Sequence, residues 1–181
     1  MFKLETERLI LRDMQQVDEE RFVKISQDNK YQRFYNEQDC HPDKYRELTK
    51  LFIEQAKDNP RTSYQLAIEK KFTGEFIGIV CLRVESDKQA SMGCGIARNS
   101  QGKGLIIEAI RSLASYGFSV LGIHRIYAET ISLNTPAVKL CKDLGMRQEA
   151  YFFENRFFKD QWWDTVVFAI LLDDWLRVNN R

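Results

Sequence analysis

The sequence lacks an excess of charge of either sign. Among its 181 residues, 27 Lys and Arg stand against 26 Asp and Glu, which leaves a net charge of +1. A protein that attracts nucleic acid or an anionic membrane through its overall field needs a basic excess. The balance therefore predicts no nucleic-acid partner and no membrane partner.

Long apolar runs and paired cysteines are also missing. The longest purely apolar run, residues 166–172, is far below the roughly 20 residues that a membrane helix needs. Early acidic residues argue against a signal peptide. The four cysteines form no Cys-x-x-Cys pair, which predicts free thiols and no metal site. We expect a cytoplasmic protein with one domain, residues 1–181, because about 100–200 residues is a typical domain length.

Hydrophobic periodicity predicts an ordered series of strands and helices. Helices are expected at residues 17–29, 43–58, 105–121 and 135–144. Strands are expected at residues 8–12, 64–69, 76–82, 92–97, 125–131, 148–157 and 162–172. The alternation in 64–69 predicts a half-buried strand, whereas the unbroken apolar run of 76–82 predicts burial on both faces. The order predicts an α+β fold, with a mixed, mostly antiparallel sheet flanked by helices.

Glycine is scarce but unevenly placed. Six of the nine glycines fall between residues 74 and 104, and Gly102 and Gly104 directly precede the helix 105–121. The N–H groups at a helix N-terminus lack internal partners, and glycines let an anion approach them closely. We therefore predict that this loop holds a phosphate group.

Two common phosphate-binding motifs do not fit this loop. A Walker A loop needs Ser or Thr after Gly-Lys, and Gly104 follows Lys103. The dinucleotide fingerprint needs a third Gly or Ala, where Arg98 or Ile107 stands. Without further context, a simple tight turn remains the alternative interpretation.

Several short motifs extend the pattern over nearly the whole chain. They are Thr6-Glu7-Arg8-Leu9-Ile10-Leu11-Arg12, Gly93-Cys94-Gly95-Ile96, Gln101-Gly102-Lys103-Gly104 with Glu108-Ala109, Asn134, Leu140-Cys141-Lys142-Asp143-Leu144-Gly145-Met146, Asp164 and Asp174-Trp175. In this order they resemble the GNAT superfamily of acyl-CoA N-acetyltransferases. The resemblance is strongest to the ribosomal-protein N-terminal acetyltransferases of the RimJ/RimL kind.

This resemblance implies a GNAT fold that binds acetyl-CoA as co-substrate between two splayed strands, without a metal. It implies that the backbone of Ile96 and Ala97 contacts the pantetheine arm and polarises the thioester carbonyl, and that Asn134 contacts the same arm. The pyrophosphate would lie on the loop and helix start formed by Gln101, Gly102, Lys103, Gly104 and Leu105. Thr135 is expected as the N-cap of the following helix, leaving the Asn134 amide free.

Catalytic groups are less clearly marked. Glu129 occupies the position that some peptide N-terminal acetyltransferases of the superfamily use as a base, and a surface carboxylate is its alternative interpretation. Ala137 and Cys141 stand where many members have Ser and Tyr, so Cys141 is the candidate acid, with a core thiol as the alternative.

The amine acceptor is expected to meet Tyr31, Phe34 and Tyr35, where the family builds its acceptor-side lid. An α-amine, with a pKa about 2.5 units below that of lysine, costs roughly 3.4 kcal/mol less to deprotonate. A site with one carboxylate base and no evident acid therefore favours a protein N-terminal α-amine or another amine of low pKa.

Two matters stay open. The final hairpin contains seven aromatic residues: Tyr151, Phe152, Phe153, Phe157, Phe158, Trp162 and Trp163. They could pack in the core, line the wall of the acceptor groove or form a dimer face. The protein could therefore be a monomer or a homodimer. The missing Ser and Tyr also allow a second function, a catalytically silent acyl-CoA-binding sensor.

Overall fold

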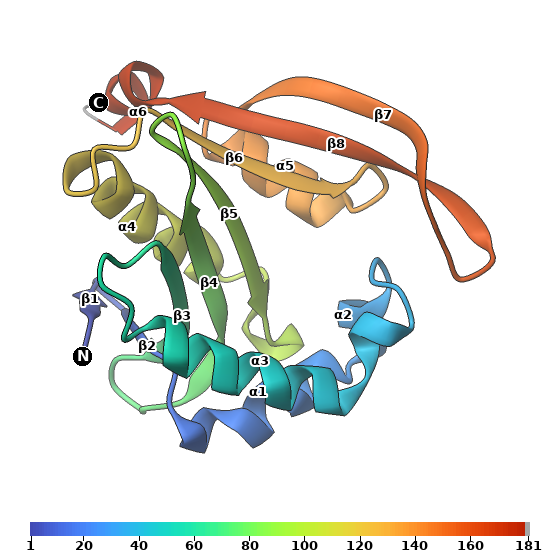
Figure 1. Ribbon diagram of the computed structural model, residues 1–181, viewed down its shortest axis with the longest axis horizontal. Coiled ribbons are helices and arrows are strands. Elements are labelled where there is room, and N and C mark those ends of the chain that lie inside the picture. Colours follow the sequence, from blue (N-terminus) through green and yellow to red (C-terminus); the bar gives the residue numbers. More distant parts are fainter. Residues whose placement is uncertain (180–181) are drawn as a thin grey trace.

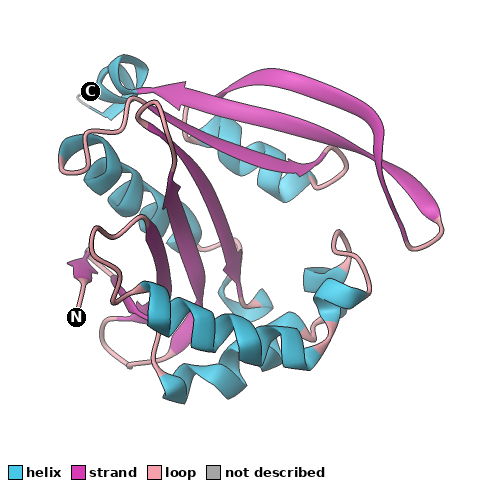
Figure 2. Ribbon diagram, in the orientation of Figure 1, coloured by secondary structure: helices cyan, strands magenta, loops and turns pink. Residues whose placement is uncertain are grey.

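In the computed structural model, which describes residues 1–179, one eight-stranded sheet forms the centre of the molecule (Figures 1 and 2). Its strand order is β1-β2-β3-β4-β5-β6-β8-β7. The strands are β1 (Lys3–Glu5), β2 (Leu9–Asp13), β3 (Ser63–Lys70), β4 (Phe76–Val84), β5 (Gln89–Ile96), β6 (Arg125–Ile131), β7 (Arg147–Phe158) and β8 (Gln161–Leu171). β5 and β6 run parallel and the other neighbours antiparallel, which confirms the predicted mixed sheet.

Within residues 1–179, six helices flank this sheet. They are α1 (Glu19–Ser26), α2 (Asn29–Gln32), α3 (Pro42–Gln55), α4 (Leu105–Ser119), α5 (Thr135–Asp143) and α6 (Leu172–Asn179). Short 3-10 turns occupy Gln16–Asp18, Gln38–Cys40 and Arg98–Ser100. α1 and α3 pack on one face of β3 and β4, and α4 packs on the other face. None of the helices within residues 1–179 is long and apolar enough to cross a membrane.

The structure corrects the expectation for β3. All of Tyr64–Ile68 is buried, although the alternating pattern predicted a half-buried strand. Helices cover both faces of β3, so its polar Gln65 is enclosed as well. The predicted strand at 8–12 is present as β2, but β1 and α6 were not predicted. The last two residues of the predicted domain 1–181 lie outside the described part.

The first predicted helix, residues 17–29, is in fact interrupted. α1 ends at Ser26, and the Asp28 side chain accepts hydrogen bonds from the N–H groups of Lys30 and Tyr31, which starts α2 as a separate helix. An aspartate at an N-cap satisfies N–H groups that have no partner within the helix. This break turns the chain, and α2 lies beyond the end of α1 (Figure 1).

Two other helices carry apolar residues outside their buried faces. In α3 the buried residues are Tyr45, Thr49 and Phe52, while the apolar Leu51 is exposed. In α4 the helix ends at Ser119, so Val120 follows it as an exposed C-cap residue. Leu51 and Val120 both lie at the edge of the apolar face of their helix, where burial depends on whether a neighbouring helix or strand covers the residue.

The sheet opens between β5 and β6. The two strands pair only from Gln89 to Ser91, opposite Arg125 to Tyr127, and then separate (Figure 1). Beyond Ser91, β5 remains paired with β4, and β6 remains paired with β8. The separation leaves one edge of β5 unpaired from Met92 onward, as the resemblance implied for the coenzyme site.

Candidate active site

The loop after β5 has the backbone conformation that its glycines permit. Gly102 and Gly104 both lie in the left-handed region, with φ of +72° and +73°. Gly104 is the N-cap of α4, and no side chain caps the first N–H groups of this helix. Left-handed backbone is costly for residues that have a Cβ atom, so glycine suits both positions. The uncapped helix start lies at the open end of β5, where the sequence predicted a phosphate site.

An ion-pair cluster attaches this loop to the N-terminal strands. The Glu108 carboxylate accepts hydrogen bonds from the Thr6 hydroxyl (2.6 Å), the Arg8 backbone N–H (2.9 Å) and the Arg8 side chain (2.7 Å). Arg8 also donates to the carbonyl of Lys103 at 3.0 Å. Burial alone would raise the pKa of Glu108, but Thr6 and Arg8 outweigh it and lower the pKa below its ordinary value. Glu108 and Arg8 therefore attach the loop before α4 to the turn between β1 and β2.

Replacing Glu108 by glutamine should remove a pH-dependent part of the stability. Because the folded pKa is lowered, the contribution of Glu108 is complete above the ordinary value near 4.5 and is lost as the pH falls below it. We expect Glu108→Gln to lower the free energy of unfolding by about 1–3 kcal/mol at pH 7, and by much less near pH 3. Thermal unfolding across this range measures the effect.

The matched control is Glu54→Gln, because Glu54 pairs with Lys57 at 2.7 Å while both side chains are largely exposed. Such surface pairs contribute about 0–1 kcal/mol. An equal loss for both variants would mean that Glu108 does not fix the loop.

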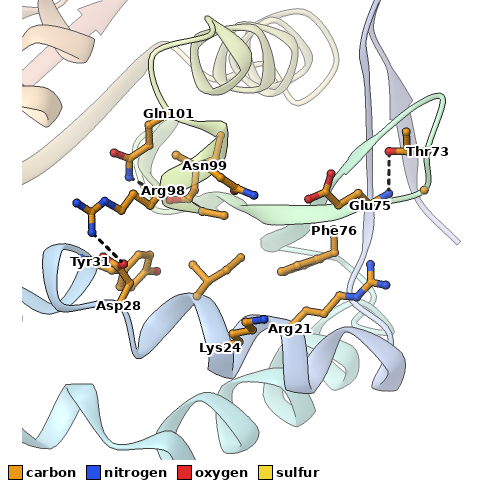
Figure 3. A pocket seen from close by; sticks show the side chains of 14 residues that line it. Arg21, Lys24, Asp28, Tyr31, Thr73, Glu75, Phe76, Arg98, Asn99 and Gln101 are labelled. Carbon is orange, nitrogen blue, oxygen red and sulfur yellow. Dashed lines mark hydrogen bonds and ion pairs between the residues drawn. The ribbon is translucent and has the colours of Figure 1, made fainter.

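The hydrogen bonds of β5 decide which backbone groups face the opening. The N–H of Ala97 donates to the carbonyl of Ile77 at 2.7 Å, and the carbonyl of Ala97 accepts from the N–H of Ser100 at 2.9 Å. Successive residues of a strand direct these groups to opposite sides, so the N–H of Ile96 points toward the open edge. The N–H of Ala97 is already used in the sheet, so of the two residues only Ile96 has its N–H on the open edge; the contact of both with the coenzyme stays a prediction. Gln101 donates its side-chain amide to the Ile96 carbonyl at 3.3 Å (Figure 3).

The other side of the opening carries Glu129 and Asn134. Glu129 is exposed on β6, where it lies opposite Val167 of β8. Asn134, rather than the predicted Thr135, is the N-cap residue of α5, and its side chain makes no capping hydrogen bond. The backbone N–H of Asn134 donates to Ile131 at 2.9 Å, which fixes this turn at the end of β6. The Asn134 amide is therefore free to contact a ligand.

Cys141 lies on the face of α5 that packs on the hydrophobic core. Its side chain is 7% exposed and packs with the residues that α4 and the sheet contribute to the main core. Burial raises the pKa of the Cys141 thiol to about 11, so the group is protonated at neutral pH. This environment agrees with the alternative interpretation of Cys141 as a core thiol, and its role as an acid stays a prediction.

The aromatic residues in α2 and directly after it connect the two sides of the opening. Tyr31 lies against Gly95 of β5 and stacks on Tyr35, with ring centroids 5.6 Å apart. Phe34 packs edge-on against Trp163 of β8 at 5.7 Å. Lys159, at the hairpin tip, donates to the carbonyl of Gln32 at 2.7 Å. The segment predicted to contact the acceptor therefore spans from β5 to the hairpin.

Adding a methyl group at Gly95 should displace Tyr31. A Cβ atom there would lie 2.4 Å from the Tyr31 hydroxyl oxygen, whereas a Cβ at Gly93 on the same face would meet nothing within 4 Å. We expect Gly95→Ala to lower the free energy of unfolding by about 1–3 kcal/mol, as overpacking does, and Gly93→Ala to leave it nearly unchanged. Thermal unfolding of the two variants tests this. Equal melting temperatures would contradict the position of Tyr31.

A cavity of about 550 Å³, which no sequence motif predicted, borders the loop that follows β5 (Figure 3). It lies between α1, the β3–β4 turn and the end of β5, and charged side chains of Arg21, Lys24, Asp28 and Arg98 line it. The Asp28 carboxylate, which caps α2, also forms an ion pair with Arg98, whose Nη1 lies 3.8 Å from Oδ2 of Asp28. The role of Asp28 as an N-cap could have been predicted from the sequence, because Asp28 stands directly before a helical segment and aspartate is typical of that position.

Comparisons with known proteins agree with this geometry. Residues 8–147 match the family described as Acetyltransferase (GNAT) domain. "Uncharacterized N-acetyltransferase p20" of Bacillus licheniformis is 26% identical over 174 residues, which cover 94% of this chain and 97% of that protein. "[Ribosomal protein uS5]-alanine N-acetyltransferase" of Escherichia coli (strain K12) is 33% identical over 84 residues, which cover 46% of this chain and 43% of that protein.

A solved structure extends the likeness to the whole fold. Spermidine N-acetyltransferase from Vibrio cholerae in complex with CoA and spermine superimposes with a TM-score of 0.80 at 24% identity, covering 94% of this chain and 99% of that one. The match confirms the predicted fold. Together with the family match over most of the sequence, it identifies the chain as a member of the GNAT acetyltransferase family, an acetyl-CoA-dependent N-acetyltransferase.

Proposed function

We propose that this protein transfers the acetyl group of acetyl-CoA directly to a primary amine bound beside α2. The observation that carries the proposal is the opening between β5 and β6, which starts after Ser91 and has the uncapped start of α4 at its end. The pyrophosphate would bind the backbone of residues 101–105, where an anion meets unpaired N–H groups. Asn134 would contact the pantetheine arm from the turn between β6 and α5, on the other side of the opening.

In this proposal the carbonyl oxygen of the thioester accepts a hydrogen bond from the N–H of Ile96, which the pairing with β4 leaves on the open edge. The amine nitrogen forms a bond to the carbonyl carbon, and negative charge on the oxygen grows as it does so. The Ile96 N–H then stabilises the transition state more than the ground state. The bond from carbon to sulfur breaks next, and the coenzyme leaves as a thiolate.

Glu129 is the proposed general base for the proton that the amine loses. It is exposed on the strand that borders the opening, so its carboxylate is accessible to an incoming amine. Cys141 is the candidate donor of a proton to the thiolate, although its burial in the core separates it from solvent. Water is the other possible donor.

The proposed acceptors are a protein N-terminal α-amine and a small-molecule amine. The uS5-alanine acetyltransferase supports the first class, and the spermidine acetyltransferase supports the second. Tyr31, Phe34 and Tyr35 would line the acceptor side. Burial raises the pKa of the Tyr31 phenol, so this hydroxyl stays protonated and can donate a hydrogen bond.

Two measurements in sequence test the proposal. Acetyl-CoA should raise the melting temperature of the protein, since a ligand that binds only the folded state stabilises it. Release of free thiol is then followed with peptides bearing a free N-terminus, with diamines and polyamines, and with lysine. Turnover on the first group alone would support the α-amine, and turnover on the second would support the small-molecule amine.

The alternative function, a silent acyl-CoA-binding sensor, rests on Ala137 and Cys141 at the positions where many members have Ser and Tyr. Stabilisation by acetyl-CoA without turnover on any acceptor would favour this sensor. No stabilisation at all would reject both functions.

A further inference from the structure

The cavity beside the loop that follows β5 has no part in the chemistry above. Its volume of about 550 Å³ lies within the range of roughly 300–1,000 Å³ that small-molecule sites occupy. α1, the turn between β3 and β4 and the end of β5 form its walls (Figure 3). The cavity is therefore large enough to hold a small molecule.

This cavity lies on the face of the sheet that α4 does not cover. Ile25, Tyr31 and Phe76 line it, and all three pack in the core cluster that α1 and α3 form with the sheet. Leu105, the first residue of α4, packs in the main core on the opposite face. The proposed pyrophosphate site is at the start of α4. A molecule in the cavity and the coenzyme would therefore approach the loop after β5 from different sides.

Part of the cavity wall is apolar and firmly held. Phe76 is the first residue of β4 and is 5% exposed, and its ring meets the ring of Phe22 edge-on, with centroids 6.5 Å apart. Ile25 of α1, which is half-buried, lines the same cavity. Because the core fixes Phe76, the wall offers a constant apolar surface. The apolar part of a ligand would leave water on binding there, which is favourable.

Two cationic side chains of α1 line the cavity without a partner. They are Arg21 and Lys24, which we call the cation pair (Figure 3). The two residues stand three positions apart on α1, so they lie on the same side of the helix. Neither side chain makes an ion pair or a hydrogen bond with another residue of the described range 1–179. Both are exposed, so they are accessible to a ligand.

The carboxylates that line the cavity are already paired. Asp28 caps α2 and lies 3.8 Å from Arg98, and Glu75 accepts a hydrogen bond from the Lys70 ammonium at 2.6 Å. These pairs leave the two positive charges of the cation pair without a counterion. A cleft lined by unpaired charge of one sign concentrates ligands of the opposite sign. The cavity therefore favours an anion over an amine.

A phosphate monoester matches both the charge and the apolar wall. At neutral pH a phosphate monoester carries about two negative charges, which equals the charge of the cation pair, whereas a carboxylate carries only one. The guanidinium of Arg21 can donate two parallel hydrogen bonds to phosphate oxygens, and the ammonium of Lys24 is a further donor. The organic part of the ester would then lie against the apolar wall.

We propose that this cavity binds a small phosphate monoester with an apolar or aromatic organic part. The cation pair holds the phosphate, and the organic part packs on Phe76 and Ile25. Arg98 lines the cavity and begins the short 3-10 turn that leads into the loop before α4. The ligand therefore contacts the segment that shapes the proposed coenzyme site, while the coenzyme itself binds elsewhere.

Isothermal titration calorimetry with phenyl phosphate tests this proposal. One molecule should bind per chain with a Kd of about 1 mM or lower. Inorganic phosphate lacks the ring and benzoate lacks the second charge, so both should bind at least about 10-fold more weakly. The double variant Arg21→Gln, Lys24→Gln should raise the Kd of phenyl phosphate at least about 10-fold, as the loss of hydrogen bonds to a charged group does.

The matched control is the double variant Lys44→Gln, Lys50→Gln, which removes two exposed cations of α3 that do not line the cavity. It should leave the Kd of phenyl phosphate unchanged. All four substituted side chains are exposed, so both double variants should fold.

A second experiment separates the cavity from the coenzyme site. Phenyl phosphate should bind with the same Kd in the presence of saturating acetyl-CoA and to the variant Gly102→Val, which alters the loop before α4. Competition with acetyl-CoA, or a Kd raised by Gly102→Val, would place the phosphate on that loop and overturn the proposal.

Three results of the first experiment would also overturn it. They are no binding of phenyl phosphate up to about 10 mM, binding of inorganic phosphate as tight as that of phenyl phosphate, and an equal loss of affinity in the two double variants. The first would mean that the cavity takes no such ligand. The other two would mean that only the general surface charge attracts the phosphate.

Discussion

Replacing Gly102 by valine should raise the dissociation constant of acetyl-CoA by roughly 30-fold or more, the effect of losing one or two hydrogen bonds to a charged group. Gly102 has a φ of +72°, and a Cβ atom there would meet no atom of the protein within 4 Å. The valine side chain would therefore occupy the space in front of the loop, where we expect the pyrophosphate. If the loop instead rearranges to relieve the strain, its N–H groups no longer converge on one anion.

A matched control exists at the other end of α4. Gly122 has a φ of +66°, and a Cβ atom there would also meet nothing within 4 Å. Gly122→Val and Gly102→Val should thus lower the free energy of unfolding by a similar amount, roughly 1–2 kcal/mol. Only Gly102→Val should weaken coenzyme binding when isothermal titration calorimetry compares them. Equal affinities for acetyl-CoA in the two variants would place the pyrophosphate elsewhere.

Replacing Glu129 by glutamine should lower kcat/KM for the amine by about 100-fold near pH 6–7, in line with the loss of a general base. An amide cannot accept the proton that the amine must lose. The loss should shrink as the pH rises above the pKa of the acceptor, about 7.7–8.0 for an α-amine, because the amine then arrives deprotonated and hydroxide can replace the base.

The pH profile of kcat/KM between pH 6 and 9.5 measures this effect. Glu47→Gln, an exposed glutamate of α3 outside the residues assigned to the site, is the control. A pH profile of Glu129→Gln parallel to that of the wild type would remove Glu129 from the mechanism. The binding of acetyl-CoA should be the same in both variants, which separates this test from that of Gly102.

Local chemistry made several features predictable. Gly102 and Gly104 lie at a strand-to-helix connection, and the left-handed backbone that they adopt is a property of these residues and their immediate neighbours. The turn of the final hairpin occurs at Lys159-Asp160 as expected, and α5 ends before Gly145, which has a φ of +79°. Turns and helix ends depend on short-range sterics, so the sequence alone reveals them.

The burial of the strands could not be predicted in the same way. The alternating pattern of β3 predicted one solvent-exposed face, but α3 and α4 cover both faces of this strand. Conversely, Phe153 and Trp162 have the composition of a core strand but lie beyond the reach of α5, where no helix of the described chain covers them. Periodicity indicates which residues share a face, and only the neighbouring elements decide whether that face is buried.

The sequence by itself determined the order of the elements, the glycine loop at the start of α4 and the family resemblance, because each depends on residues close together in the chain. Only the tertiary structure decided that Ile96, and not Ala97, directs its N–H to the opening, because that choice is made by pairing with β4. The contact of Tyr31 with Gly95 and the exposure of Phe153 and Trp162 likewise depend on how distant segments are arranged, and no local pattern encodes that geometry.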